Sequence, residues 1–223
     1  MKRTNIKLCG FRTPEDVEKV EGIPVDAIGF ILVPGRKRSV RPEQIAVLVD
    51  RVPPGVLTVG VLINPSLEEI DKWLSLAPLQ AIQLHGEETA SFCRSIKERF
   101  SVRVIKTFHV DEQMESPCSI KEYSPWVDVA LLDSGAGQIR GGTGTTFDWE
   151  QISLFRKECR SVQIPLWVAG GLNEQNVEAL IRAYAPDGVD VSSGIESDGE
   201  KDRQKMKRFV ERVVRSGQTA HSV

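Results

Sequence analysis

The chain has 223 residues, of which 40% are hydrophobic and 27% are charged, the balance of an ordinary globular protein with a sizeable core. Its 29 basic and 31 acidic side chains leave a net charge of −2, which favours neither a nucleic-acid partner nor an anionic membrane surface. No apolar run approaches the roughly 20 residues that cross a bilayer, and the N-terminal residues show no signal-peptide pattern.

The four cysteines lie far apart at Cys9, Cys93, Cys118 and Cys159, with no Cys-x-x-Cys pair. This spacing argues against both a disulfide framework and a metal site. Free thiols suit a reducing compartment, so we expect a cytoplasmic protein without a bound metal.

Eight short, mostly apolar runs recur along the chain, as expected for parallel strands that are buried on both faces. The expected strands are Asn5–Gly10, Ala27–Leu32, Thr58–Ile63, Ala81–His85, Arg103–Phe108, Val127–Asp133, Pro165–Ala169 and Gly188–Ser192.

Amphipathic stretches follow these runs. Ile70, Trp73 and Leu74, for example, fall on one helical face behind the candidate N-cap Ser66. The expected helices are Pro14–Glu21, Pro42–Val52, Ser66–Leu74, Thr89–Phe100, Glu115–Tyr123, Asp148–Cys159, Glu174–Tyr184 and Asp202–Arg215.

Eight strands alternating with eight helices predict an α/β fold, a single-domain (β/α)8 TIM barrel over residues 1–216. Residues 217–223 are polar, and we expect them to form a disordered tail. The alternative, an open doubly wound sheet, requires a glycine-rich dinucleotide loop after the first strand, and Cys9–Thr13 is not such a loop.

Small residues follow the sixth, seventh and eighth expected strands. Glycine lets backbone amides approach an anion, and barrels commonly bind phosphate after strands seven and eight. Ordinary tight turns are the alternative, but three such turns in adjacent loops favour a phosphate site. Its expected residues are Gly141, Gly142, Thr143, Gly144, Gly170, Gly171, Ser192, Ser193 and Gly194.

Cys9 and Asp133 are the candidate catalytic pair, because they end the first and sixth expected strands and both can point into the barrel mouth. A thiolate can remove a proton and a carboxylic acid can supply one. The structural alternatives are a small buried apolar residue for Cys9 and a turn or cap residue for Asp133.

Four further residues are expected to bind substrate. Arg38, in the loop after the second strand, can grip a carboxylate with its planar fork, unless it is only a solvated charge. Lys7 can either polarise the site or extend to the barrel rim, an alternative that also applies to Lys106. Gln83 and His85 end the fourth strand, and we interpret His85 as a hydrogen-bonded residue rather than an acid–base group.

With these motifs laid out, the chain resembles the phosphoribosylanthranilate isomerase family of tryptophan biosynthesis over nearly its whole length. The resemblance rests on the order of several short motifs, each weak by itself. They are Ile6–Gly10, Gln83–Gly86, Leu131–Asp133, Gly141–Gly144 followed by Phe147–Trp149, Ala169–Leu172, Val189–Glu196 and Lys201–Asp202.

The resemblance implies an Amadori rearrangement with Cys9 as general base, Asp133 as general acid and no cofactor or metal. It also implies that Arg38 lies near the anthranilate end of the substrate and that the glycine turns bind the phosphate. The partner is then a phosphorylated small molecule, with no nucleic acid or membrane, and the protein is a monomer or a homodimer.

The loop Val33–Ser39 is more basic than the family pattern, so Arg36 is an alternative to Arg38 for the anthranilate contact. Two alternative functions fit the sequence less well. The related sugar-phosphate isomerase of histidine biosynthesis has an aspartate in place of Cys9 and two similar halves, and neither feature fits. A catalytically inactive phosphate-binding barrel would have lost Cys9 or Asp133, and both are present.

Overall fold

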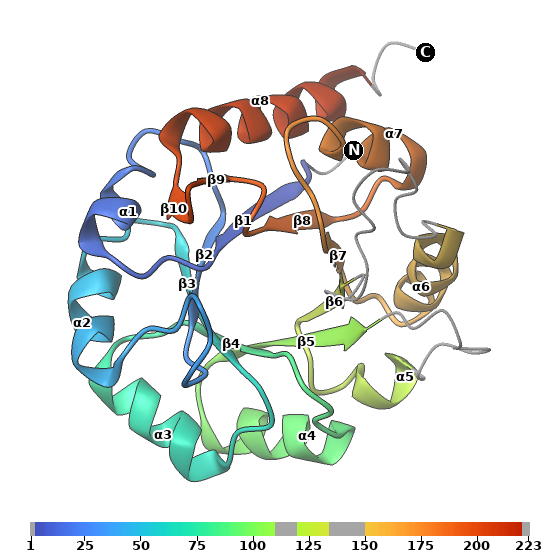
Figure 1. Ribbon diagram of the computed structural model, residues 1–223. Coiled ribbons are helices and arrows are strands. Elements are labelled where there is room, and N and C mark those ends of the chain that lie inside the picture. The colour runs from blue at the N-terminus through green and yellow to red at the C-terminus, as the bar shows by residue number, and fades with distance from the viewer. Residues whose placement is uncertain (1–2, 110–119, 134–149, 220–223) are drawn as a thin grey trace.

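The computed structural model describes residues 3–109, 120–133 and 150–219, and its main feature is a closed barrel of eight parallel strands in sequential order (Figure 1). This confirms the predicted fold class. The strands are β1 (Asn5–Cys9), β2 (Ala27–Ile31), β3 (Leu57–Leu62), β4 (Ala81–Leu84), β5 (Arg103–His109), β6 (Val129–Asp133), β7 (Leu166–Ala169) and β8 (Gly188–Val191).

Helices surround the barrel (Figure 1). They are α1 (Pro14–Glu18), α2 (Pro42–Asp50), α3 (Leu67–Leu76), α4 (Ala90–Arg99), α5 (Ile120–Tyr123), α6 (Glu150–Ser161), α7 (Val177–Tyr184) and α8 (Arg203–Thr219). Ser66 caps α3 in a reciprocal capping box with Glu69, as the sequence pattern predicts.

Several bounds differ from the sequence prediction by a few residues. Helix α1 ends at Glu18 rather than Glu21, α7 begins at Val177 rather than Glu174, and α8 continues to Thr219 rather than ending at Arg215. The boundary of the tail at 217 stays a prediction. An antiparallel hairpin, β9 (Glu196–Ser197) and β10 (Glu200–Lys201), was not predicted and follows β8.

Alternate residues of each strand face two different cores. The barrel interior holds a small apolar cluster that includes Val59, Ile105, Leu131 and Trp167. The larger core lies between the strands and the helices. Because side chains alternate along a strand, a residue two positions beyond an interior one also faces the interior, toward the carboxyl end of the barrel.

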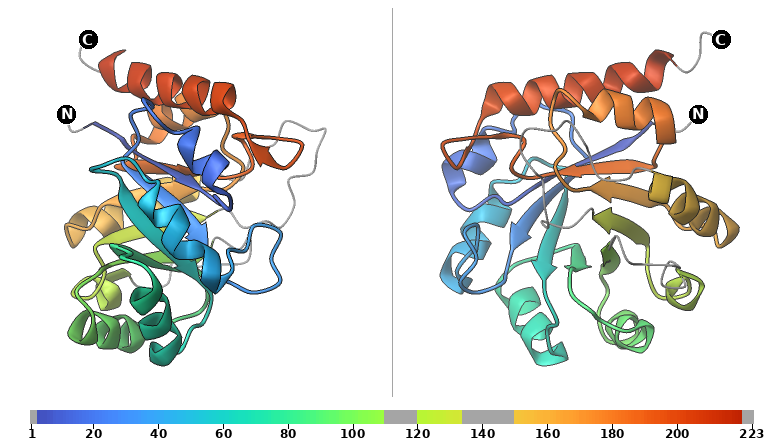
Figure 2. Two further views of the ribbon diagram at one scale, coloured as in Figure 1. Left: turned by 90° about the vertical axis from the view of Figure 1, so that its left-hand side faces the viewer. Right: turned by 45° about the vertical axis from the view of Figure 1, so that its right-hand side comes forward.

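The loops at that end build the rim of the site. In Figure 2 the loop after β2 and the β9–β10 hairpin extend on the same side of the barrel. A bridge between Asn173 and Gly194 joins the loops after β7 and β8. Among the described residues, no helix is both long enough and apolar enough to cross a membrane.

Candidate active site

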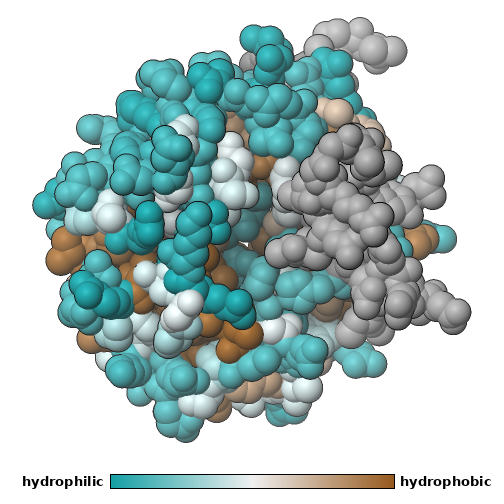
Figure 3. Space-filling model, in the orientation of Figure 1, coloured by the Kyte–Doolittle hydropathy of each residue, from teal (hydrophilic) through white to brown (hydrophobic). Residues whose placement is uncertain are grey.

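The carboxyl end of the barrel brings the predicted catalytic residues to one chamber. Figure 3 looks onto this end and shows a hollow at its centre within a largely hydrophilic surface. Asp133 follows the interior residue Leu131 on β6, and Cys9 ends β1 with 7% of its surface exposed. Cys9 and Asp133 therefore both face the barrel mouth.

Lys7 lies directly beside Cys9. A Cβ atom placed on Gly29 would lie 2.7 Å from Cys9 Sγ and 3.0 Å from Lys7 Nζ, so both groups occupy the space above this glycine of the neighbouring strand. Burial raises the pKa of the Cys9 thiol, and the Lys7 ammonium partly offsets that effect. The cation therefore favours the thiolate at a place where burial opposes it.

A buried ion pair fixes the position of Lys7. Its Nζ donates to Asp190 Oδ2 at 2.9 Å, and the two residues are register partners across β1 and β8. Burial alone would lower the pKa of Lys7, but its anionic surroundings, the Asp190 carboxylate above all, raise that pKa. Lys7 thus remains a cation inside the barrel rather than extending to solvent.

His85 approaches the other catalytic candidate, with its Nε2 atom 3.7 Å from Asp133 Oδ2. Its Nδ1 atom lies 3.2 Å from Thr107 Oγ1 and 3.4 Å from Gln83 Nε2. Burial lowers the pKa of His85 from 6.5 to about 4, so the ring is neutral near pH 7. This supports the interpretation of His85 as a hydrogen-bonded residue.

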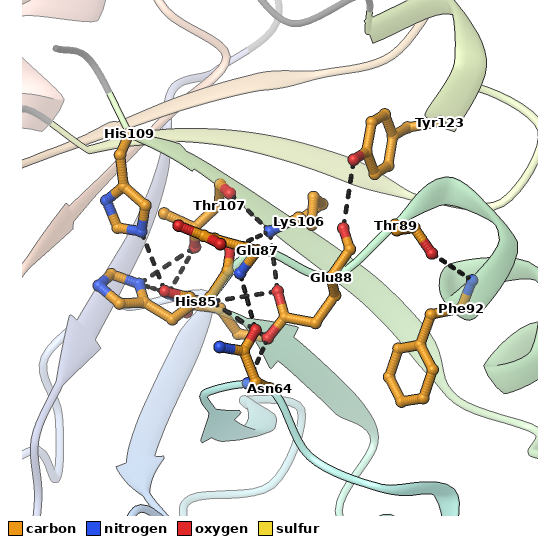
Figure 4. A network of polar contacts seen from close by, with 12 residues as sticks. Asn64, His85, Glu87, Glu88, Thr89, Phe92, Lys106, Thr107, His109 and Tyr123 are labelled. Atoms are coloured by element: carbon orange, nitrogen blue, oxygen red, sulfur yellow. Dashed lines mark hydrogen bonds and ion pairs between the residues drawn. The ribbon is translucent and has the colours of Figure 1, made fainter.

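The loop that follows His85 is held by a second buried ion pair, which Figure 4 shows. Lys106 Nζ donates to Glu88 Oε2 at 2.9 Å and to Gly86 O at 2.7 Å. Glu88 Oε1 in turn accepts from the backbone N–H groups of Asn64 and Gly86. Lys106 therefore lies behind β5, on the helix side of the barrel wall, and supports the β4 loop instead of polarising the chamber.

Arg38 reaches the rim of the chamber, where its guanidinium pairs with Glu196 of the β9–β10 hairpin. Lys201 binds the same carboxylate, with 2.8 Å between its Nζ and Glu196 Oε1. Arg36 donates its backbone N–H to Ser39 Oγ, and Ser39 in turn bridges back to Val33 within the same loop.

Several polar atoms at the mouth have no partner within the described part of the chain. They are Gln83 Oε1, Asp190 Oδ1 and Ser192 Oγ, and all three are buried. Buried polar groups are nearly always hydrogen-bonded, so these atoms mark positions where a polar ligand or water can bind.

The glycine turns after β7 and β8 lie together. Gly170 and Gly171 have φ values of +96° and +60°, and a Cβ atom on Gly194 would lie 2.0 Å from Leu172 O. Ser192 and Ser193 follow β8 in the same corner. The remaining phosphate candidates, Gly141, Gly142, Thr143 and Gly144, lie outside the described residues.

Sequence reasoning missed Asp190, Glu196 and Lys201 as site residues. A signal was present for Asp190, because a single carboxylate inside the apolar run Gly188–Ser192 needs a buried cation, and Lys7 occupies a comparable run. Glu196 and Lys201 belong to the unpredicted hairpin and had no such signal. Within the described ranges, no group of three or more His, Cys, Asp or Glu residues could hold a metal ion.

Comparisons with known proteins identify the family of the chain. Residues 6–212 match the family model of N-(5'phosphoribosyl)anthranilate isomerase. An N-(5'-phosphoribosyl)anthranilate isomerase of Brevibacillus brevis is 39% identical over 210 residues, which cover 94% of this chain and 93% of the relative.

Two solved structures of such isomerases share the fold. One, in complex with reduced 1-(o-carboxyphenylamino)-1-deoxyribulose 5-phosphate, superposes with a TM-score of 0.76 at 34% identity, covering 94% of this chain and 98% of the other. The other contains monomers generated from the dimeric Thermotoga maritima enzyme, with a TM-score of 0.77, 32% identity and the same coverage. The chain therefore belongs to the family of N-(5'-phosphoribosyl)anthranilate isomerases, which are enzymes of tryptophan biosynthesis.

Proposed function

We propose that the protein catalyses the Amadori rearrangement of N-(5-phosphoribosyl)anthranilate to 1-(2-carboxyphenylamino)-1-deoxyribulose 5-phosphate, with Cys9 as general base and Asp133 as general acid. The observation that carries the proposal is the placement of a thiol and a carboxyl group at the ends of β1 and β6, both facing one chamber. The relative that binds the reduced form of this product supports the choice of substrate.

The chemistry needs one acid and one base. Asp133 protonates the ribose ring oxygen, the bond from that oxygen to C1 breaks, and a protonated Schiff base forms with the anthranilate nitrogen. The Cys9 thiolate then removes the C2 proton, and the electron pair moves toward the nitrogen to give an enolamine. Loss of the enol proton and protonation of C1 yield the ketone, so the substrate nitrogen serves as the electron sink and no cofactor is required.

The charges around Cys9 suit this role. The cations of Lys7 and Lys201 both lower the pKa of its thiol, while burial raises it. We infer that the resting enzyme keeps a protonated thiol and that the cations offset the cost of forming the thiolate once substrate excludes water.

The remaining candidate residues are proposed to bind different parts of the substrate. Gly170, Gly171, Ser192, Ser193 and Gly194 are proposed to bind the phosphate, together with Gly141–Gly144. Lys7, Gln83 and His85 are proposed to face the ribose, and Arg38 the anthranilate carboxylate. The unpartnered Gln83 Oε1 and Ser192 Oγ atoms support this division, because substrate hydroxyl and phosphate groups can supply their missing partners.

The assembly and location remain proposals as well. A monomer or a homodimer is expected; the relative from Thermotoga maritima is dimeric, and monomers generated from it have been solved. The buried free thiols Cys9, Cys93 and Cys159 suit a reducing compartment such as the cytoplasm.

A direct assay tests the function. Purified protein is mixed with freshly prepared phosphoribosylanthranilate, and the decrease of anthranilate-type fluorescence is followed. Enzyme-dependent loss of the signal is expected, with a product that co-elutes with synthetic carboxyphenylamino-deoxyribulose phosphate. Absence of turnover by protein with intact circular dichroism would refute the proposal.

A further inference from the structure

The guanidinium that is proposed to bind the substrate carboxylate is already bound to a carboxylate of the protein. Arg38 Nε lies 2.6 Å from Glu196 Oε1 and Arg38 Nη2 lies 2.7 Å from Glu196 Oε2. This two-point pair uses one edge of the planar guanidinium and fixes its orientation.

Glu196 is built into the protein too firmly to act as an exchangeable counter-ion. Its side chain is 7% exposed, whereas that of Arg38 is 23% exposed. Lys201 Nζ binds Glu196 Oε1 at 2.8 Å and Ser192 O at 3.1 Å. Burial would raise the pKa of Glu196, but the hydrogen bonds from Arg38 and Lys201 outweigh it and lower that pKa, so the carboxylate stays charged.

The stem of Arg38 is positioned just as closely. A Cβ atom on Gly10 would lie 2.7 Å from Arg38 Cδ, and Gly10 has a φ of +84°. The side chain therefore passes over a residue that must be glycine both for its backbone and for this contact.

The two loops that carry Arg38 and Glu196 are also tied to each other. Arg12 donates to Gly199 O in the hairpin at 3.0 Å and to Lys37 O at 3.4 Å. Lys37 directly precedes Arg38, so Arg12 bridges the arginine's loop and the turn of the β9–β10 hairpin.

The opposite edge of the guanidinium remains available. Among the described residues, Nη1 of Arg38 donates no hydrogen bond, and the more exposed partner of the pair is the arginine. We propose that Glu196 is a positioning residue that presents the Nη1 edge of Arg38 to the carboxylate of the anthranilate ring. This inference rests on the proposed function.

The test compares two inhibitors in the wild type and in Glu196→Gln. One is reduced carboxyphenylamino-deoxyribulose phosphate, and the other is the same compound without the ring carboxylate. Glu196→Gln removes one hydrogen-bond acceptor and the negative charge. The Ki of the carboxylate inhibitor and the KM of the substrate should therefore each rise by about tenfold or more. The inhibitor without the carboxylate should bind as before, and kcat should change much less than KM.

A double-mutant cycle separates positioning from a general structural role. In an Arg38→Met background, Glu196→Gln should have no further effect on the carboxylate inhibitor. Glu178→Gln is the matched control, because Glu178 is also shared by two cations, Arg182 and Arg212, but lies on α7. It should leave both inhibition constants unchanged.

Equal weakening of the two inhibitors, no weakening of either, or a full Glu196→Gln effect without Arg38 would overturn the inference. If Glu196→Gln does not fold, Glu196→Asp retains the charge but withdraws the carboxylate, and the same selective loss is expected. Turnover by the wild type distinguishes the cases, because its absence refutes the proposed function, whereas turnover without this selectivity refutes only the role of Glu196.

Discussion

Individual residues at the barrel mouth carry the proposed chemistry, and Cys9 and Asp133 can be tested directly. Cys9→Ala and Asp133→Ala should each lower kcat by about 100-fold or more, since each variant lacks a group that transfers a proton. Steady-state fluorescence assays provide the measurement. Cys93→Ala, which removes a buried thiol outside the chamber, should retain kcat; a near-wild-type rate for Cys9→Ala or Asp133→Ala would remove that residue from its role.

The effect of Lys7 on the Cys9 thiol can be tested through the titration of Cys9. The ammonium of Lys7 lowers the pKa of the Cys9 thiol, so Lys7→Met should shift the pH profile of Cys9 alkylation by iodoacetamide upward by about one unit or more. Mass spectrometry of the Cys9 peptide measures the rate at each pH.

Lys106→Met is the matched control for Lys7→Met. Lys106 is also a buried strand lysine paired with a carboxylate, but its partner is Glu88 on the far side of the barrel wall. Lys106→Met should leave the pH profile of Cys9 alkylation unchanged. The same profile in the wild type and Lys7→Met would show that Lys7 does not stabilise the thiolate.

At the scale of elements, the loop between β4 and α4 depends on one carboxylate. Glu88 binds Lys106 and two backbone N–H groups, and these contacts lower its pKa although burial raises it. Glu88→Gln leaves Lys106 buried without its counter-ion and should reduce the free energy of unfolding by about 3–5 kcal/mol.

Urea denaturation monitored by circular dichroism measures this loss. The neighbouring exposed residue Glu87 provides the control, since Glu87→Gln should change stability by no more than about 0.5 kcal/mol. Similar effects of the two substitutions would contradict a special role for Glu88.

At the scale of the whole molecule, His85 makes stability depend on pH. Burial lowers its folded-state pKa from 6.5 to about 4, so between these values the unfolded chain binds a proton that the native protein does not. The contribution of His85 to stability is therefore fully present above pH 6.5 and falls by about 3 kcal/mol as the pH decreases toward 4.

Urea titrations between pH 7 and 4.5 measure the slope. His85→Gln should flatten it over this interval. A wild-type stability that is constant from pH 7 to 4.5 would contradict the buried, neutral His85.

The sequence by itself determined the barrel. Eight apolar runs, each followed by an amphipathic stretch, are local patterns that can be recognised in a single sequence. Burial on both faces of a strand and on one face of a helix dictates the residue types at those positions. The same reading placed Cys9 and Asp133 at strand ends, and in a parallel barrel all strand ends meet at one mouth.

The tertiary structure alone decided which groups touch. Lys7 meets Asp190 because β1 pairs with β8 when the barrel closes, which puts the two residues in register. A local sequence pattern cannot predict this pairing. Lys106 faces the opposite side of the barrel wall from the chamber, although both lysines lie in similar apolar runs. Glu196 meets both Arg38 and Lys201 through a hairpin of two-residue strands, which is too short to leave a periodic signal. Contacts between residues far apart in the sequence thus set the electrostatics of the site.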